Sequence, residues 1–195
     1  MEFVPWPKTP RLENEKFVIT EKIDGTNAQI LIEYYPIDAA LSFPGACFVN
    51  IINEGEKQLV IHTGSRNRWI TPSDDNFGFS AWVQGNALYL AKILGHGRHY
   101  GEWWGKGIQR GYNAPRKTFS LFNTFRPKES LQGFPGLDIV PVLYKGSGSL
   151  PEEILAAETR LKVGGSIASP GFMNPEGICI YMELTKSIYK VPFNK

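Results

Sequence analysis

Residues 17–28 read FVITEKIDGTNA, and this stretch decides the fold of the chain. It begins with four residues that favour β structure and continues into a tight turn at Gly25. Residues 29–35, QILIEYY, then form a second apolar segment. The pattern predicts two strands joined by a glycine-containing turn, with Lys22 and Asp24 beside that turn.

The remaining sequence predicts many short strands and two helices. Apolar residues at helical spacing predict a helix over 81–94. Another helix is expected over 150–163, where Ser149 and Glu152 have capping-box spacing and two glycines follow. Further strands are predicted over 48–52, 58–62, 100–104, 118–123, 137–144, 177–183 and 187–191. Prolines keep residues 1–15 extended, and the whole pattern indicates a compact α+β domain.

Composition excludes several classes of protein. The 195 residues are 42% hydrophobic and 21% charged, which is ordinary for a globular protein and excludes disorder as the main state. The net charge of +2 excludes a polycation, so any contact with nucleic acid must come from a local basic cluster. Cys47 and Cys179 form no CxxC pair, which argues against a structural zinc site and a disulfide scaffold. Neither a leader-like apolar stretch nor a membrane-length apolar run occurs, and we expect a cytoplasmic protein, in the host cell if viral.

Six short motifs follow one another in a set order. The first is Lys22-Ile23-Asp24-Gly25, which by itself is a weak signal and could be a plain turn with a solvated lysine. It is followed by SRNR at 65–68, YGEWWGKGI at 100–108, FSLFN at 119–123, PEGICIY at 175–181 and SIYKV at 187–191. This ordered set resembles the covalent nucleotidyltransferase superfamily of polynucleotide ligases and mRNA capping enzymes. The TEKIDGTNA context is most similar to the RNA ligase branch, typified by nick-sealing phage RNA ligases.

The resemblance implies a fold and an activity. The fold would be an ATP-grasp-like nucleotidyltransferase domain, in which two antiparallel sheets are flanked by helices with the nucleotide cleft between them. Residues 1–195 would form this single domain, without the OB-fold or helical domain that relatives append. The activity would be that of a minimal, ATP-dependent RNA ligase, suited to RNA repair, which joins 5′-phosphate to 3′-hydroxyl ends through a lysyl–AMP intermediate. ATP and Mg²⁺ would be the cofactors, with Mn²⁺ as a substitute, and nucleic acid ends the partner; no protein partner is implied.

The chemistry of such a reaction fits these residue types. A lysine attacks an α-phosphorus as a neutral amine, but the ordinary lysine pKa is about 10.4, so nearby cations or desolvation must favour the neutral form. The resemblance implies that Lys22 is this nucleophile, with Lys190 at the α-phosphate and Lys186 as a less certain helper in a turn. Glu176 would bind the divalent ion or support Lys22; its plainer alternative is a turn carboxylate.

The other motif residues would surround the nucleotide. Glu21 would contact the adenine edge, chiefly through its backbone carbonyl, and Phe122 would stack on the adenine, with Phe119 as the other candidate. Glu102 would accept a hydrogen bond from a ribose hydroxyl, or else form a buried salt bridge. The remaining nucleotide-binding residues implied by the motifs are Asp24, Gly25, Asn27 and Arg66. For Arg66 the plainer alternative is a solvated hairpin end.

Several alternatives stay open at this level. The family often has Asp where Asn123 stands, which weakens any charge-dependent role there. The basic loop at 105–117 could follow a phosphate backbone or be merely solvated. Neighbouring His96 and His99 lack the further ligands that zinc needs, so a zinc site is the less favoured reading. The rival functions are a DNA ligase, a GTP-using capping-type enzyme and a non-catalytic module that binds nucleic acid ends.

Overall fold

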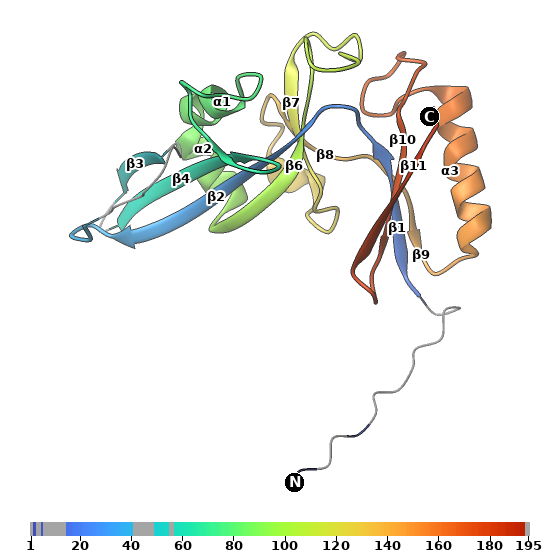
Figure 1. Cartoon of the computed structure of the whole chain (residues 1–195), viewed down its shortest axis with the longest axis horizontal. Coiled ribbons are helices and arrows are strands. Elements are labelled where there is room, and N and C mark those ends of the chain that lie inside the picture. Colours follow the sequence, from blue (N-terminus) through green and yellow to red (C-terminus); the bar gives the residue numbers. More distant parts are fainter. Residues whose placement is uncertain (1, 3–4, 6–14, 41–48, 55–56, 194–195) are drawn as a thin grey trace. The chain divides into compact units, whose positions relative to one another are not determined.

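The computed structural model describes residues 2, 5, 15–40, 49–54 and 57–193. Cys47, most of the expected extended lead-in and residues 55 and 56 of the predicted turn at 53–56 lie outside these residues. The chain forms two compact units (Figure 1). Unit 1 contains residues 1–22 and 141–195, and unit 2 contains residues 23–140. No helix in the described part of the chain is both long and apolar enough to cross a membrane.

Unit 1 is a four-stranded antiparallel sheet with one helix on it (Figure 1). The strands lie in the order β11 (Ser187–Pro192), β10 (Gly177–Met182), β1 (Phe17–Lys22) and β9 (Val142–Gly146). Helix α3 (Leu150–Gly164) packs Ala157 and Leu161 against Phe17, Ile19 and Ile178. Since side chains alternate along a strand, Thr20 and Lys22 of β1 face away from α3.

Unit 2 is built on a larger sheet with two helices. Its strands follow the order β3 (Val49–Glu54), β4 (Lys57–Ser65), β2 (Thr26–Pro36), β6 (Gly97–Gly105), β7 (Lys117–Leu121) and β8 (Leu137–Ile139), while β5 (Trp69–Ile70) pairs with β4. The helices are α1 (Phe79–Gly85) and α2 (Ala87–Leu94), and a short 3₁₀ helix spans Lys128–Leu131. Apolar residues of α1 and α2 share a core with Ile30, Ile32 and Leu59 of the sheet.

The α+β class and the two sheets are confirmed, with one exception to antiparallel pairing. Strands β7 and β8 run parallel. The strand predicted over 137–144 is in fact two strands, β8 in unit 2 and β9 in unit 1. Pro141 separates them because a proline has no N–H to donate to a strand ladder.

The helix predicted over 81–94 is also divided. Asn86 interrupts it with φ −124°, and its side-chain amide donates to the Trp82 carbonyl at 2.7 Å. Such side-chain bonds compete with the helical backbone pattern. The helix starts earlier than predicted because the Asp75 carboxylate accepts hydrogen bonds from the backbone N–H groups of Ser80 and Ala81. In α3 the predicted capping bond is absent, although Ser149 occupies the N-cap position.

Candidate functional site

In unit 1 the Lys22 amine forms an ion pair with the Glu176 carboxylate. Lys22 is the last residue of β1 and lies opposite Gly177, the first residue of β10. Glu176 directly precedes Gly177, so the strand register brings the two side chains together. Both side chains are partly accessible, at 21% and 18% of their area. The antiparallel pairing therefore joins two predicted site residues that are distant in sequence.

Lys190 lies on the same face of this sheet as Lys22. Thr20, Cys179 and Lys190 are direct neighbours across β1, β10 and β11. Because paired residues in antiparallel strands point the same way, and Lys22 is two residues from Thr20, all of these side chains share the face away from α3. Lys22 is aligned with Gly177 and, on β11, with Pro192. The exposed Lys190 is two residues from Pro192 along β11.

Lys186 lies farther from Lys22 than Lys190 does in the strand register. It occupies the turn between β10 and β11 with φ 56°, as expected of a turn residue. Its ammonium lies 6.0 Å from the ring centroid of Tyr181, whose partner on β1 is Val18. Val18 is at the opposite end of β1 from Lys22, so the register separates the predicted helper from the nucleophile.

The Glu21 side chain points to the other face and is 1% exposed. Its carboxylate accepts hydrogen bonds from the Ser166 hydroxyl at 2.5 Å and from the backbone N–H groups of Ile167 and Ala168 at 2.8 and 2.9 Å. This carboxylate therefore anchors the segment that follows α3. The structure leaves only the Glu21 backbone for the predicted adenine contact, which stays a prediction.

The two oxygens of the Glu176 carboxylate have different surroundings. Oε1 is paired with Lys22, whereas Oε2 is buried and has no hydrogen-bond partner among the described residues. Burying a charged oxygen without a partner is costly, so this atom suits a ligand that is a cation or a donor. Carboxylate oxygen is the ligand type that Mg²⁺ and Mn²⁺ prefer. Glu176 consequently fits its predicted metal role.

In unit 2, Glu102 is the centre of a second group of predicted site residues with Gly25 and Asn27, which we call the Glu102 site. It lies directly opposite Asn27 in the β2–β6 pair and is 8% exposed. Its Oε1 accepts a hydrogen bond from the Gly25 N–H at 3.1 Å, and its Oε2 accepts one from the Asn27 side-chain amide at 2.8 Å. An ionised carboxylate has about four acceptor positions, and these two bonds use two of them.

Gly25 is required by close packing at this turn. A Cβ atom at this position would lie 2.5 Å from the Trp103 carbonyl oxygen and 2.7 Å from the Trp104 Cβ. The glycine lets the turn approach β6 and donate to Glu102. Trp103 and Trp104 are themselves 2% and 5% exposed, so both are packing residues.

The basic loop at 105–117 folds back onto Asp24. The Asp24 carboxylate pairs with Arg110 Nε at 2.9 Å, and its backbone N–H donates to the Tyr112 hydroxyl at 2.8 Å. Lys117 donates to the Phe77 carbonyl at 2.6 Å. Sequence reasoning missed this clamp on the motif, because it treated the loop as a nucleic-acid contact or as solvated.

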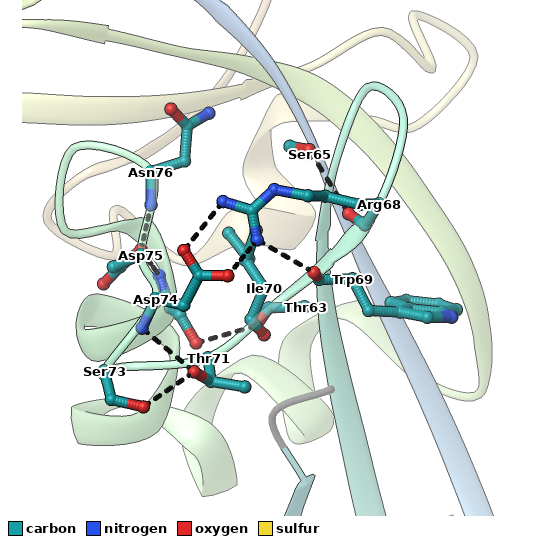
Figure 2. A network of polar contacts seen from close by, with 11 residues as sticks. Thr63, Ser65, Arg68, Trp69, Ile70, Thr71, Ser73, Asp74, Asp75 and Asn76 are labelled. Carbon is teal, nitrogen blue, oxygen red and sulfur yellow. Dashed lines mark hydrogen bonds and ion pairs between the residues drawn. The ribbon is translucent and has the colours of Figure 1, made fainter. Parts of the chain in front are cut away.

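The two arginines of the SRNR segment, Arg66 and Arg68, have different surroundings. Arg68 forms a two-pronged ion pair with Asp74, which also bonds to Thr71 (Figure 2). Figure 2 shows the Arg68 side chain directed toward the Asp74 carboxylate, which lies in the turn that leads to Asp75. Arg66 is exposed, and none of the described residues forms a hydrogen bond or ion pair with it. The structural role therefore belongs to Arg68, and Arg66 remains available for a ligand.

The two candidate stacking residues are distinguished by burial. Phe119 is fully buried against Phe79, with ring centroids 5.0 Å apart. Phe122 directly follows β7 and is 44% exposed, and its N–H donates to the Tyr100 carbonyl at 3.0 Å. Of the two, Phe122 is the one whose ring a nucleotide can reach.

His62 is buried, His99 is half-buried and His96 is exposed. Burial lowers the pKa of His99, whose Nε2 lies 3.0 Å from the Gly95 carbonyl oxygen. Burial likewise lowers the pKa of His62, against the opposing effect of Glu33 at 3.3 Å. Across the described ranges, no three His, Cys, Asp or Glu side chains gather in a metal-binding group.

The comparisons with known proteins agree with this arrangement. The chain resembles solved structures of an RNA ligase from Naegleria gruberi. One mutant of that ligase with ATP and Mn gives a TM-score of 0.60 at 17% identity, and two mutants with AMP and Mn give 0.57 and 0.58 at 17% and 18%. The matches cover 93–94% of this chain and 51% of those chains, so the chain spans about half their length. At these identities, the likeness shows a shared fold.

A search of curated protein sequences gives no match. The family model described as RNA ligase, in contrast, matches residues 15–191, which include all of the motifs. The chain therefore belongs to the RNA ligase family.

Proposed function

We propose that this chain catalyses ATP-dependent RNA ligation with Lys22 as the nucleophile. The neutral Lys22 amine attacks the α-phosphorus of ATP, so that an N–P bond forms and pyrophosphate leaves. A 5′-phosphate oxygen of RNA then attacks the same phosphorus, which frees the lysine and leaves AMP on the RNA end. Finally a 3′-hydroxyl loses its proton, attacks the 5′-phosphorus and displaces AMP, which completes the phosphodiester.

The placement of Lys22 carries this proposal. It ends a strand, is partly accessible, is paired with Glu176 and shares its face with Lys190. An accessible amine at a strand end, beside a carboxylate and another lysine, is suited to phosphate chemistry. Lys190 would hold the α-phosphate and offset the negative charge that develops on it.

Glu176 would position the amine through Oε1 and hold a divalent cation through Oε2. An ion pair with a carboxylate favours the ammonium form of a lysine, whereas attack requires the amine. When bound, Mg²⁺ or Mn²⁺ would offset the Glu176 charge and neutralise the phosphates. The Naegleria gruberi structures with ATP and Mn support this choice of nucleotide and ion.

The Glu102 site of unit 2 would recognise the nucleoside. Glu102 is held by Gly25 and Asn27 and would accept the ribose hydroxyl, while the exposed Phe122 would stack on the base. Arg66 would contact the ribose and orient the phosphates or the RNA end. The clamp of Arg110 and Tyr112 on Asp24 fixes the turn that supplies the Gly25 donor.

A sealing assay tests the proposal. A 5′-phosphorylated RNA with a 3′-hydroxyl is incubated with the protein, ATP and Mg²⁺, and its 5′-phosphate is then challenged with phosphatase. We expect phosphatase-resistant, longer or circular RNA from the wild type and from Lys92→Ala, which changes an exposed lysine of α2. Lys22→Ala should form none. Equal sealing by Lys22→Ala would contradict the proposal, and sealing of DNA alone would favour the DNA ligase alternative.

A further inference from the structure

The outer face of the unit 2 sheet, opposite α1 and α2, carries an ordered row of side chains. Ile30 and Ile32 of β2 point to the helices, so Gln29 points to the outer face. The register places Tyr100 of β6 beside Gln29 on one side and Gly64 of β4 on the other, with Trp69 of β5 next to Gly64. Tyr100, Gln29 and Trp69 therefore lie in one line across four strands.

Arg98 contacts two residues of this row, Trp69 and Gln29. Its guanidinium lies 5.2 Å from the Trp69 ring centroid and donates to the Gln29 side-chain oxygen. The Gln29 amide nitrogen in turn donates to the Ser65 carbonyl at 3.2 Å. Gly64 makes room for this, because a Cβ there would lie 2.8 Å from Gln29 Cγ. We call Gln29, Trp69, Arg98 and Tyr100 the platform; contacts among Gln29, Trp69 and Arg98 hold these three side chains before any ligand arrives.

The platform is accessible and continuous with the Glu102 site. Tyr100 is 54% exposed, and its carbonyl accepts the Phe122 N–H. Along β6, Tyr100 and Glu102 point to the same face and are two residues, about 7 Å, apart. Arg98 is exposed as well, whereas the nearby acidic residue, Glu33, is already engaged by His62. The platform thus offers an aromatic face and a cation beside the residues proposed to bind the nucleotide.

We propose that the platform binds an unpaired nucleotide of the RNA strand next to the joint, an inference that rests on the proposed function. The Tyr100 ring would stack on the base, and Arg98 would pair with a phosphate. Exposed aromatic rings stack on bases that have been released from a helix, whereas bases inside a continuous duplex offer no free face. The substrate class favoured by this surface is therefore RNA with single-stranded ends, bound without sequence preference.

Binding of a short, fluorescent, 5′-phosphorylated single-stranded RNA, followed by anisotropy, tests the proposal. Tyr100→Ala should weaken binding about tenfold, as expected for the loss of one stacked base, and Tyr100→Phe should restore it. Tyr89→Ala removes a comparably exposed ring, 65% accessible on α2, and should bind as wild type does. Arg98→Gln should reduce the slope of log K against log salt by about 0.7, the value for one phosphate contact on a single strand.

The outcomes separate this inference from the proposed function. The AMP-bearing fraction of each protein is measured by mass in the same samples, and binding is compared between adenylylated molecules. Wild-type binding by Tyr100→Ala and an unchanged salt slope for Arg98→Gln would overturn the platform while leaving the ligase chemistry standing. No binding of the RNA by adenylylated wild type would also overturn it. An equal loss on fully paired, nicked duplex would overturn the preference for unpaired nucleotides.

Discussion

Lys22 and Glu176 are ion-paired although they are far apart in the sequence. The pairing of Lys22 with Gly177 across β1 and β10 is what brings them together. One carboxylate oxygen is used by the lysine and the other is buried without a partner among the residues described. Glu176 therefore connects the proposed nucleophile with the proposed metal.

Glu176→Gln should lower the rate of protein adenylylation by about a hundredfold or more, because it removes the charge that pairs with Lys22 and with a cation. The Mn²⁺ concentration needed for half-maximal rate should rise at the same time. Quenched-flow measurement of AMP incorporation over a Mn²⁺ series gives both quantities. Glu158→Gln, which changes a paired glutamate on α3, is the control and should leave both unaltered. A rate effect without any change in Mn²⁺ dependence would contradict the metal role.

Gly25→Ala should lower the free energy of unfolding by about 1–3 kcal/mol, since its Cβ would overlap the Trp103 carbonyl and the Trp104 side chain. Gly85→Ala is the matched control, because no atom lies within 4 Å of an added Cβ there. At that helical position alanine should raise stability by up to about 1 kcal/mol. Urea denaturation of both variants measures the difference. Equal stability of the two would show that the turn does not approach β6 as closely as described.

Glu21→Ala should lower the free energy of unfolding by about 2–4 kcal/mol, because one buried and two partly buried donors lose their carboxylate. Ser166→Ala removes one of those donors and should cost only about 1 kcal/mol. Chemical denaturation compares them. If Glu21→Ala proved as mild as Ser166→Ala, the anchoring role of the carboxylate would be wrong.

Stability should fall as the pH is lowered through the histidine range. Burial lowers the pKa of both His99 and His62 in the folded state, so the unfolded chain binds more protons below about pH 6.5. The stabilisation is complete above that pH and is lost progressively below it. Urea unfolding at pH 7.5, 6.5 and 5.5 should show this decline, and His99→Gln should make it shallower. A wild type more stable at pH 5.5 than at pH 7.5 would contradict the burial of neutral imidazoles.

The sequence predicts the parts of this protein that depend on local pattern. The strand that ends at Lys22, the turn at Gly25, helix α3 and the turn position of Lys186 all follow from β propensity, glycine and apolar spacing. The order of the motifs also predicts the family, which the family model confirms.

The contacts around the predicted site residues were not predictable in this way. Glu21 is anchored by the segment after α3, and Asp24 is held by Arg110 and Tyr112; these contacts depend on how distant loops fold back. The helix break at Asn86 arises from a hydrogen bond between its side chain and the backbone, and the spacing of apolar residues does not predict such a bond. Long-range geometry, rather than residue type, decides the contacts of Glu21 and Asp24.

The most direct test of the account is the mass of the intact protein after incubation with Mg²⁺ and either ATP or GTP. Pyrophosphate treatment comes first, so that any AMP already bound is removed. We predict a gain of one AMP group with ATP, none with GTP, and none for Lys22→Ala with either nucleotide. A gain with GTP alone would indicate a capping-type enzyme. No adduct on pyrophosphate-treated wild type, or an adduct that persists in Lys22→Ala, would contradict the assignment of Lys22 as the nucleophile.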